Sequence, residues 1–159
     1  MNIDNPSPRE HSLYEESFAH YPHVAEQMVL TAVRTWLRPT CGAVRRGEDW
    51  RDILTEAGIS SLGINCFDML MCSLSHASGK PLDMRCRCAT DLAKDEASLL
   101  QTVALLQITC DAEATQLLDA WLPHPTVSTV IKNLRWVALA LLDAGLVIRV
   151  RARRVTYLH

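Results

Sequence analysis

The chain has 159 residues, of which 48% are hydrophobic and 21% are charged, and its formal net charge is −2. One ordinary domain has about this length, and this balance of apolar and charged residues excludes a disordered or low-complexity chain and favours one folded core. The apolar runs all end well before the roughly 18 residues that a membrane span needs, so we expect no membrane segment.

The two ends of the chain differ in what they predict. Residues 1–11 are expected to form a tail, because Pro6, Pro8 and a polar composition oppose regular structure there. Residues 12–159 are expected to form a single helical domain with a basic strand at its C-terminus. The start of the chain lacks the apolar stretch of a signal peptide, so we place the protein in the cytoplasm, where its six cysteines would be reduced.

Apolar residues recur at helical spacing through most of the domain. We predict a short helix after Ser12 and longer helices over 22–37, 48–57, 62–76, 90–107, 111–122 and 126–145. Gly58 and Gly145 fit the left-handed position that ends many helices. The helix over 62–76 is apolar nearly all round, which is typical of a central, buried helix.

Two segments have the alternating pattern of half-buried strands instead. Apolar and polar residues alternate in 82–88, LDMRCRC, and in 146–152, LVIRVRA. A lone strand is unstable, so we expect these two to pair in a small sheet against the helices. The predicted fold class is therefore mainly α, α+β at most: a single-domain helical bundle with a small two- or three-stranded sheet.

Four cysteines raise the hypothesis of a metal or redox site. Cys86 and Cys88 share one face of the predicted strand, and Cys66 and Cys72 on the preceding helix could complete a set of four ligands. The spacing CxxC is absent, and buried cysteines also serve as small apolar residues. A metal or redox sensor acting through Cys86 and Cys88 is one alternative function, and we predict no cofactor.

The motifs of the common enzyme families are missing from the sequence. It has no GxSxG, no HExxH, no phosphate-binding loop and no glycine-rich dinucleotide fingerprint. Acidic pairs such as Asp95–Glu96 fall near predicted helix N-termini, where they complement the helix dipole. We therefore interpret the chain as leaning towards a non-catalytic protein.

Positive charge is concentrated near the C-terminus. From residue 125 to 159 six basic residues accompany a single acid, Asp143, so this segment carries +5 and the remaining 124 residues carry −7. Such asymmetry is typical of a nucleic-acid-binding face, although arginines also protect an exposed sheet edge. The candidate nucleic-acid-binding residues are Lys132, Arg135, Arg149, Arg151, Arg153 and Arg154.

The same segment resembles the winged-helix DNA-binding domains. The resemblance covers the last 60 to 70 residues and depends on Thr126-Val127-Ser128 at a helix start, Leu134 within the helix, Gly145-Leu146-Val147 at its exit and RVRARRVTY as a basic wing. The stretches LLQTVALLQ and ATQLLDAWL would supply the two preceding helices. The resemblance implies a DNA-binding transcriptional regulator as the second alternative function.

The function that we favour is a non-catalytic cytoplasmic domain that regulates or binds other proteins, and that forms a homodimer. Trp136 and Leu139 lie off the main apolar stripe of the last helix, which predicts that this helix makes contacts on two sides. Aromatic residues are enriched at protein interfaces. Trp136 and Leu139 are therefore the candidate interface residues.

Overall fold

The computed structural model describes residues 23–38, 49–77, 79–87 and 89–151. Within these residues it contains six α-helices and no β-strand, which confirms the mainly α class. The helices are α2 (Val24–Leu37), α3 (Trp50–Glu56), α4 (Ser61–Ala77), α5 (Lys94–Gln107), α6 (Asp111–Trp121) and α7 (His124–Asp143). The predicted tail, the helix after Ser12 and the end of the last predicted strand lie outside the described residues.

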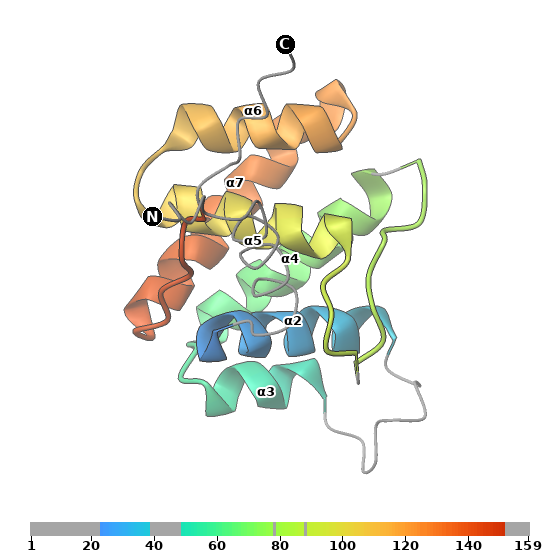
Figure 1. The fold of residues 1–159 in the computed structure, drawn as a ribbon. Helices are drawn as coiled ribbons and strands as arrows, with labels where there is room; N and C mark the ends of the chain where they lie inside the picture. Colours follow the sequence, from blue (N-terminus) through green and yellow to red (C-terminus); the bar gives the residue numbers. More distant parts are fainter. Residues whose placement is uncertain (1–22, 39–48, 78, 88, 152–159) are drawn as a thin grey trace, which may run out of the picture.

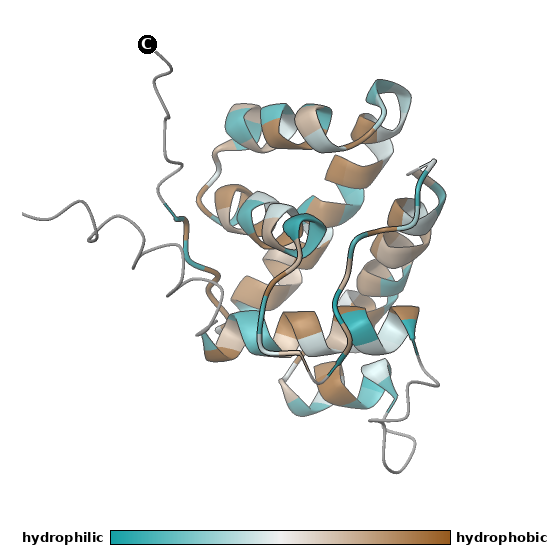
Figure 2. Ribbon diagram, turned by 45° about the vertical axis from the view of Figure 1, so that its right-hand side comes forward, coloured by the Kyte–Doolittle hydropathy of each residue, from teal (hydrophilic) through white to brown (hydrophobic). Residues whose placement is uncertain are grey.

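Three of the described helices pack around α7. Figure 1 shows α6 at one end of the molecule and α2 and α3 at the other, with α4, α5 and α7 between them. Helix α7 packs against α4, α5 and α6, and α2 packs against α3. Most helices carry apolar residues along one side and polar residues along another, as Figure 2 shows. Leu74, Leu100, Leu118 and Leu134 are fully buried where these apolar sides meet.

The predicted small sheet is wrong for the described residues, because side chains of α5 occupy the place of a partner strand. Along the connection from α4 to α5, the Asp95 carboxylate accepts a hydrogen bond from the N–H of Asp83 at 2.6 Å. Glu96 accepts one from the N–H of Arg85 at 2.8 Å. The alternation is real over 82–86, with Met84 buried, but the backbone of Asp83 and Arg85 bonds to carboxylates instead of to the second predicted strand.

Two glutamines of α5 hold the second extended segment in the same way. The Gln107 carboxamide donates to the carbonyl of Leu146 at 2.9 Å and accepts from the N–H of Ile148 at 2.8 Å. The Gln101 carboxamide accepts from the N–H of Arg151 at 3.0 Å and lies 3.4 Å from the carbonyl of Arg149. A carboxamide offers one donor and one acceptor side by side, so each glutamine reproduces one repeat of a strand ladder.

A buried ion pair joins α2 to α5 and to the connection before α5. Arg34 donates through Nε and Nη2 to the two carboxylate oxygens of Glu96, each at 2.8 Å, and both side chains are buried. The same guanidinium donates to the carbonyls of Ala89 at 2.9 Å and Asp91 at 3.0 Å. Figure 1 shows the path that this contact fixes, with the connection descending to α2 and returning to α5.

Glycines end two helices as predicted, whereas a threonine ends a third. Gly58 and Gly145 have φ values of 91° and 76°, the left-handed conformation. After α5 the N–H of Cys110 donates to the carbonyl of Leu105 at 2.9 Å, which is the same closing pattern, but the left-handed residue is Thr109 with φ 62°. A β-branched residue in this conformation is strained.

We therefore expect Thr109→Gly to raise the free energy of unfolding. The left-handed conformation costs an L-residue about 1–2 kcal/mol, and the greater chain entropy of glycine offsets part of the gain, so the net increase should be about 0.5–1 kcal/mol. Urea denaturation measures it. The reverse control is Gly145→Ala, which should lower stability by a similar amount; a loss of stability in Thr109→Gly would refute the assignment of strain.

Candidate interaction surface

Helices α4 and α7 run antiparallel in close contact. Near the start of α4, a Cβ atom on Gly63 would lie 2.9 Å from the Cβ of Ala140, towards the end of α7. Further along α4, the side-chain oxygen of Ser73 accepts a hydrogen bond at 3.1 Å from the Asn133 amide, nearer the start of α7. Residue numbers rise along one helix as they fall along the other, so the two chain directions are opposed.

Four large apolar side chains of this helix pair are more than half exposed. They are Leu62 at 66%, Met69 at 60%, Trp136 at 52% and Leu139 at 53%. Each residue turns a helix by about 100°, so Leu62 and Met69 are rotated in one sense from Gly63, and Trp136 and Leu139 in the same sense from Asn133. In antiparallel neighbours the same sense of rotation leads to the same side of the pair. We call these four residues the α4/α7 apolar face.

This face corrects the expectation that the helix over 62–76 is buried all round. Phe67, Met71 and Leu74 do face the core, but Leu62 and Met69 face outwards. The sequence therefore indicated the α7 half of the surface and missed the α4 half. An apolar position at helical spacing carries no signal that separates a core contact from an exposed one, because the difference depends on which helix packs alongside.

Charged residues lie at both ends of the exposed stripe on α7. Lys132 precedes Trp136 by four residues, and Asp143 follows Leu139 by four residues. Both charged residues are exposed. Positions four and three residues apart lie on one side of a helix, so the four residues form a continuous row.

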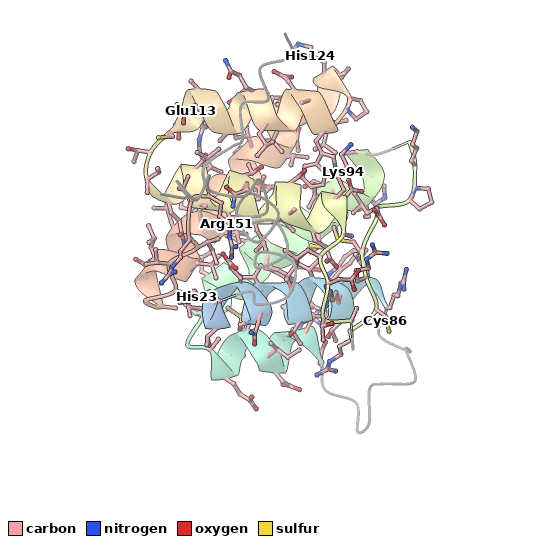
Figure 3. The ribbon with its side chains drawn as sticks, in the orientation of Figure 1. His23, Cys86, Lys94, Glu113, His124 and Arg151 are labelled. Atoms are coloured by element: carbon pink, nitrogen blue, oxygen red, sulfur yellow. The ribbon has the colours of Figure 1, made fainter. Side chains whose placement is uncertain are left out.

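Two of the candidate nucleic-acid-binding residues are paired with carboxylates. Arg135 lies 3.3 Å from Asp111, and Arg151 lies 2.8 Å from the buried Glu26. Figure 3 shows Arg151 in the space between α5 and α2, where it reaches the first turn of α2 beside His23. Arg135 therefore joins α7 to α6, and Arg151 joins the C-terminal segment to α2.

The remaining candidates do not form one surface that the structure describes. Lys132 and Arg149 are exposed, the first on α7 and the second on the segment that follows it. Arg153 and Arg154 lie outside the described residues. Residues 146–151 belong to no strand, and most of the basic wing that the resemblance implies, RVRARRVTY, lies outside the described residues.

The candidate metal ligands are not gathered at a metal site in the described part of the chain. Cys66 is half-buried and packs against the core, whereas Cys72 is exposed on another side of α4. Cys86 lies in the extended connection (Figure 3), and Cys88 is outside the described residues. Among the residues that are described, no three His, Cys, Asp or Glu side chains are placed to hold a metal ion.

Cys110, which was not among the candidates, has a perturbed thiol. Desolvation raises its pKa above the ordinary value, and the negative charges of Glu113 and Asp111 act in the same direction. A raised pKa keeps the thiol protonated, and the thiolate is the form that binds metals and attacks disulfides. Cys110 is therefore a poor substitute for the missing ligands.

The described residues thus define a helical domain whose prominent exposed feature is an apolar face on an antiparallel helix pair. No described helix is long and apolar enough to cross a membrane. Comparison with protein-family models, with curated proteins and with solved structures finds no match to this chain. The argument for function therefore depends on the geometry of the surface.

Proposed function

We propose that this chain is a non-catalytic domain that binds another protein chain, in a regulatory role, through the α4/α7 apolar face. The observation that carries the proposal is that Leu62, Met69, Trp136 and Leu139 are each more than half exposed on one side of two packed helices. Large exposed apolar side chains on one side of a helix pair are typical of protein–protein contact sites. Tryptophan and methionine are also enriched in such sites, and tryptophan often contributes much of the binding energy.

The α4/α7 apolar face is held in place by contacts between and behind the two helices, which favours a role in binding. Asn133 joins α7 to α4 through Ser73, and Gly63 lets the two helices approach closely. On its other side α7 is packed against α5 and α6. The exposed side chains therefore project from helices whose positions are fixed, and a surface held in place loses less conformational entropy when it binds.

Photo-crosslinking tests this proposal in cells of the source organism. A photoreactive amino acid at position 62 or 69 should give a crosslinked product of higher mass, because both positions belong to the face and are exposed. The matched control is position 24, where Val24 is 77% exposed on α2, away from the face. Crosslinking at position 24 alone, or at none of the three positions, would count against the face as a binding surface.

DNA binding through the basic segment is the alternative, and the charge of +5 over residues 125–159 supports it. Phosphate contacts release counterions, so binding of this kind weakens steeply as salt rises. The pairing of Arg135 with Asp111 and of Arg151 with Glu26 leaves fewer positive charges for such contacts. A gel shift titrated with salt, repeated with Arg149, Arg151, Arg153 and Arg154 changed to glutamine, distinguishes this alternative from the first proposal.

A further inference from the structure

We propose that the occupant of the α4/α7 apolar face is a second copy of this chain, bound with its α7 antiparallel to the first across a two-fold axis. This inference rests on the proposed function and names the partner. The axis would pass between the two α7 helices, at the level midway between Val137 and Ala138. Two independent sets of residues on α7 place it there, one apolar and one charged.

The apolar residues give the first placement. When two identical helices pack antiparallel about a two-fold axis, residues equally distant from the axis face each other across it. Trp136 and Leu139 are centred on the point midway between Val137 and Ala138. Trp136 of one copy therefore faces Leu139 of the other, and the reverse contact is made at the same time. A large ring opposite a branched aliphatic side chain fills the space that two facing tryptophans would overfill.

The charged residues give the same placement. Lys132 lies four residues before Trp136, and Asp143 lies four residues after Leu139, so this pair is centred on the same point. Lys132 of one copy faces Asp143 of the other on both sides of the axis. Opposite charges at these positions favour the antiparallel arrangement, whereas a parallel pair would set lysine against lysine and aspartate against aspartate.

The spacing of the four residues is that of a helix–helix seam. Lys132, Trp136, Leu139 and Asp143 follow one another at intervals of four, three and four residues, which keeps them in line along one helix. The buried row of α7, including Val130, Leu134 and Leu141, already packs in its own chain. The outer row thus repeats the pattern of a packed helix without a partner helix among the described residues.

Helix α4 widens this contact on each side of the axis. Leu62 and Met69 face the same way as the outer row of α7 and are 66% and 60% exposed. In the proposed dimer they flank the α7 helix of the second copy. The interface then consists of four helices, an α4–α7 pair from each copy, with apolar residues inside and the charged residues nearer its rim, as in known interfaces.

Sedimentation equilibrium of the full chain and of charge variants tests the inference. Lys132→Glu sets like charges against each other twice in the dimer, and so does Asp143→Lys. Each should raise the dimer dissociation constant about ten-fold at low salt, because two exposed attractive ion pairs become two repulsive pairs. The double variant Lys132→Glu/Asp143→Lys restores opposite charges, so its dissociation constant should return to within about three-fold of the original value.

Removal of the central side chain should have a larger effect. Trp136→Ser is expected to raise the dissociation constant about 100-fold, as substitutions of central tryptophans commonly do. The matched control is Val24→Ser, which removes an apolar side chain that is 77% exposed on another helix and should leave association unchanged. Circular dichroism melts show whether each variant is folded. We expect all of them to fold, because the substituted side chains are exposed on the helix surface.

The possible outcomes separate this inference from the proposed function. A chain that stays monomeric up to about 1 mM, or a double variant as weak as the single ones, would overturn the two-fold dimer. If crosslinking at position 62 or 69 then gave a product with a different protein, the interaction domain would stand and the second copy would be the wrong partner. A dimer that responds to Trp136→Ser and is rescued by the charge swap would support both.

Discussion

Replacing Arg34 with methionine is expected to lower the free energy of unfolding by about 3–5 kcal/mol, because it leaves the buried Glu96 carboxylate without its countercharge. Glu96 has no exposed surface, and Arg34 supplies two of its hydrogen bonds at 2.8 Å. Domains of this size are stable by about 5–15 kcal/mol in total, so the loss would be a large fraction of the whole. Urea denaturation followed by circular dichroism measures the change.

The effect should reach beyond the ion pair itself. Arg34 also donates to the carbonyls of Ala89 and Asp91, so its loss should release the connection before α5. Amide hydrogen exchange at Arg85, whose N–H is bonded to Glu96, should then become faster than in the unmodified chain.

An exposed ion pair provides the control. Arg135→Met removes the partner of Asp111, but these two side chains are about half exposed, so the change should stay below about 1 kcal/mol. Equal losses of stability in Arg34→Met and Arg135→Met would show that burial does not determine how much an ion pair contributes to the free energy of unfolding. The double variant Arg34→Met/Glu96→Met should be less destabilised than the sum of the single ones, because it removes both charges together.

The parts of the fold that the sequence predicted are those in which local pattern and tertiary packing agree. The stripe of Val130, Leu134 and Leu141 at helical spacing predicted both the helix and the side that is buried. Gly145 predicted the end of that helix, since few other residues adopt its φ of 76° without strain. Both features depend on residues within one or two turns of each other.

The predicted sheet failed because alternation identifies an extended backbone and not its partner. Residues 82–86 and 146–151 form no strand, and side chains of α5 accept hydrogen bonds from N–H groups in both segments. Gln101 and Gln107 have no pattern that separates them from glutamines on a solvated helix face. The sequence explained Glu96 only as a favourable charge near a helix start. Its contact with Arg34 spans 62 residues, so no local pattern indicates it.

The candidate surface was predictable in part for the same reason. Trp136 and Leu139 lie outside the apolar stripe of their own helix, so the sequence alone singled them out, and both are more than half exposed. Leu62 and Met69 lie among apolar residues on every side of α4, so nothing local distinguished them from the core. Their exposure follows from the position of α7 beside α4, which Gly63 and Asn133 determine.

Gly63→Val is therefore expected to act on both the fold and the surface. A Cβ at this position would lie 2.7 Å from a methyl carbon of Ile59 and 2.9 Å from the Cβ of Ala140, closer than packed atoms allow. Because the Ala140 side chain cannot turn away, α4 and α7 must separate, and we expect a loss of about 3 kcal/mol in the free energy of unfolding. Chemical denaturation measures this loss, with Gly79→Ala as control, since nothing lies within 4 Å of that position.

A compensating substitution connects this loss to the contact between the helices. Ala140→Gly alone should cost about 1 kcal/mol through helix propensity. Combined with Gly63→Val it removes one of the two close contacts, so the double variant should be more stable than the sum of the single effects. Strict additivity would mean that Gly63 does not set the distance between α4 and α7. Because Leu62 adjoins Gly63 on α4, a separation of the helices should also move it away from Trp136 and weaken self-association in the variants that remain folded.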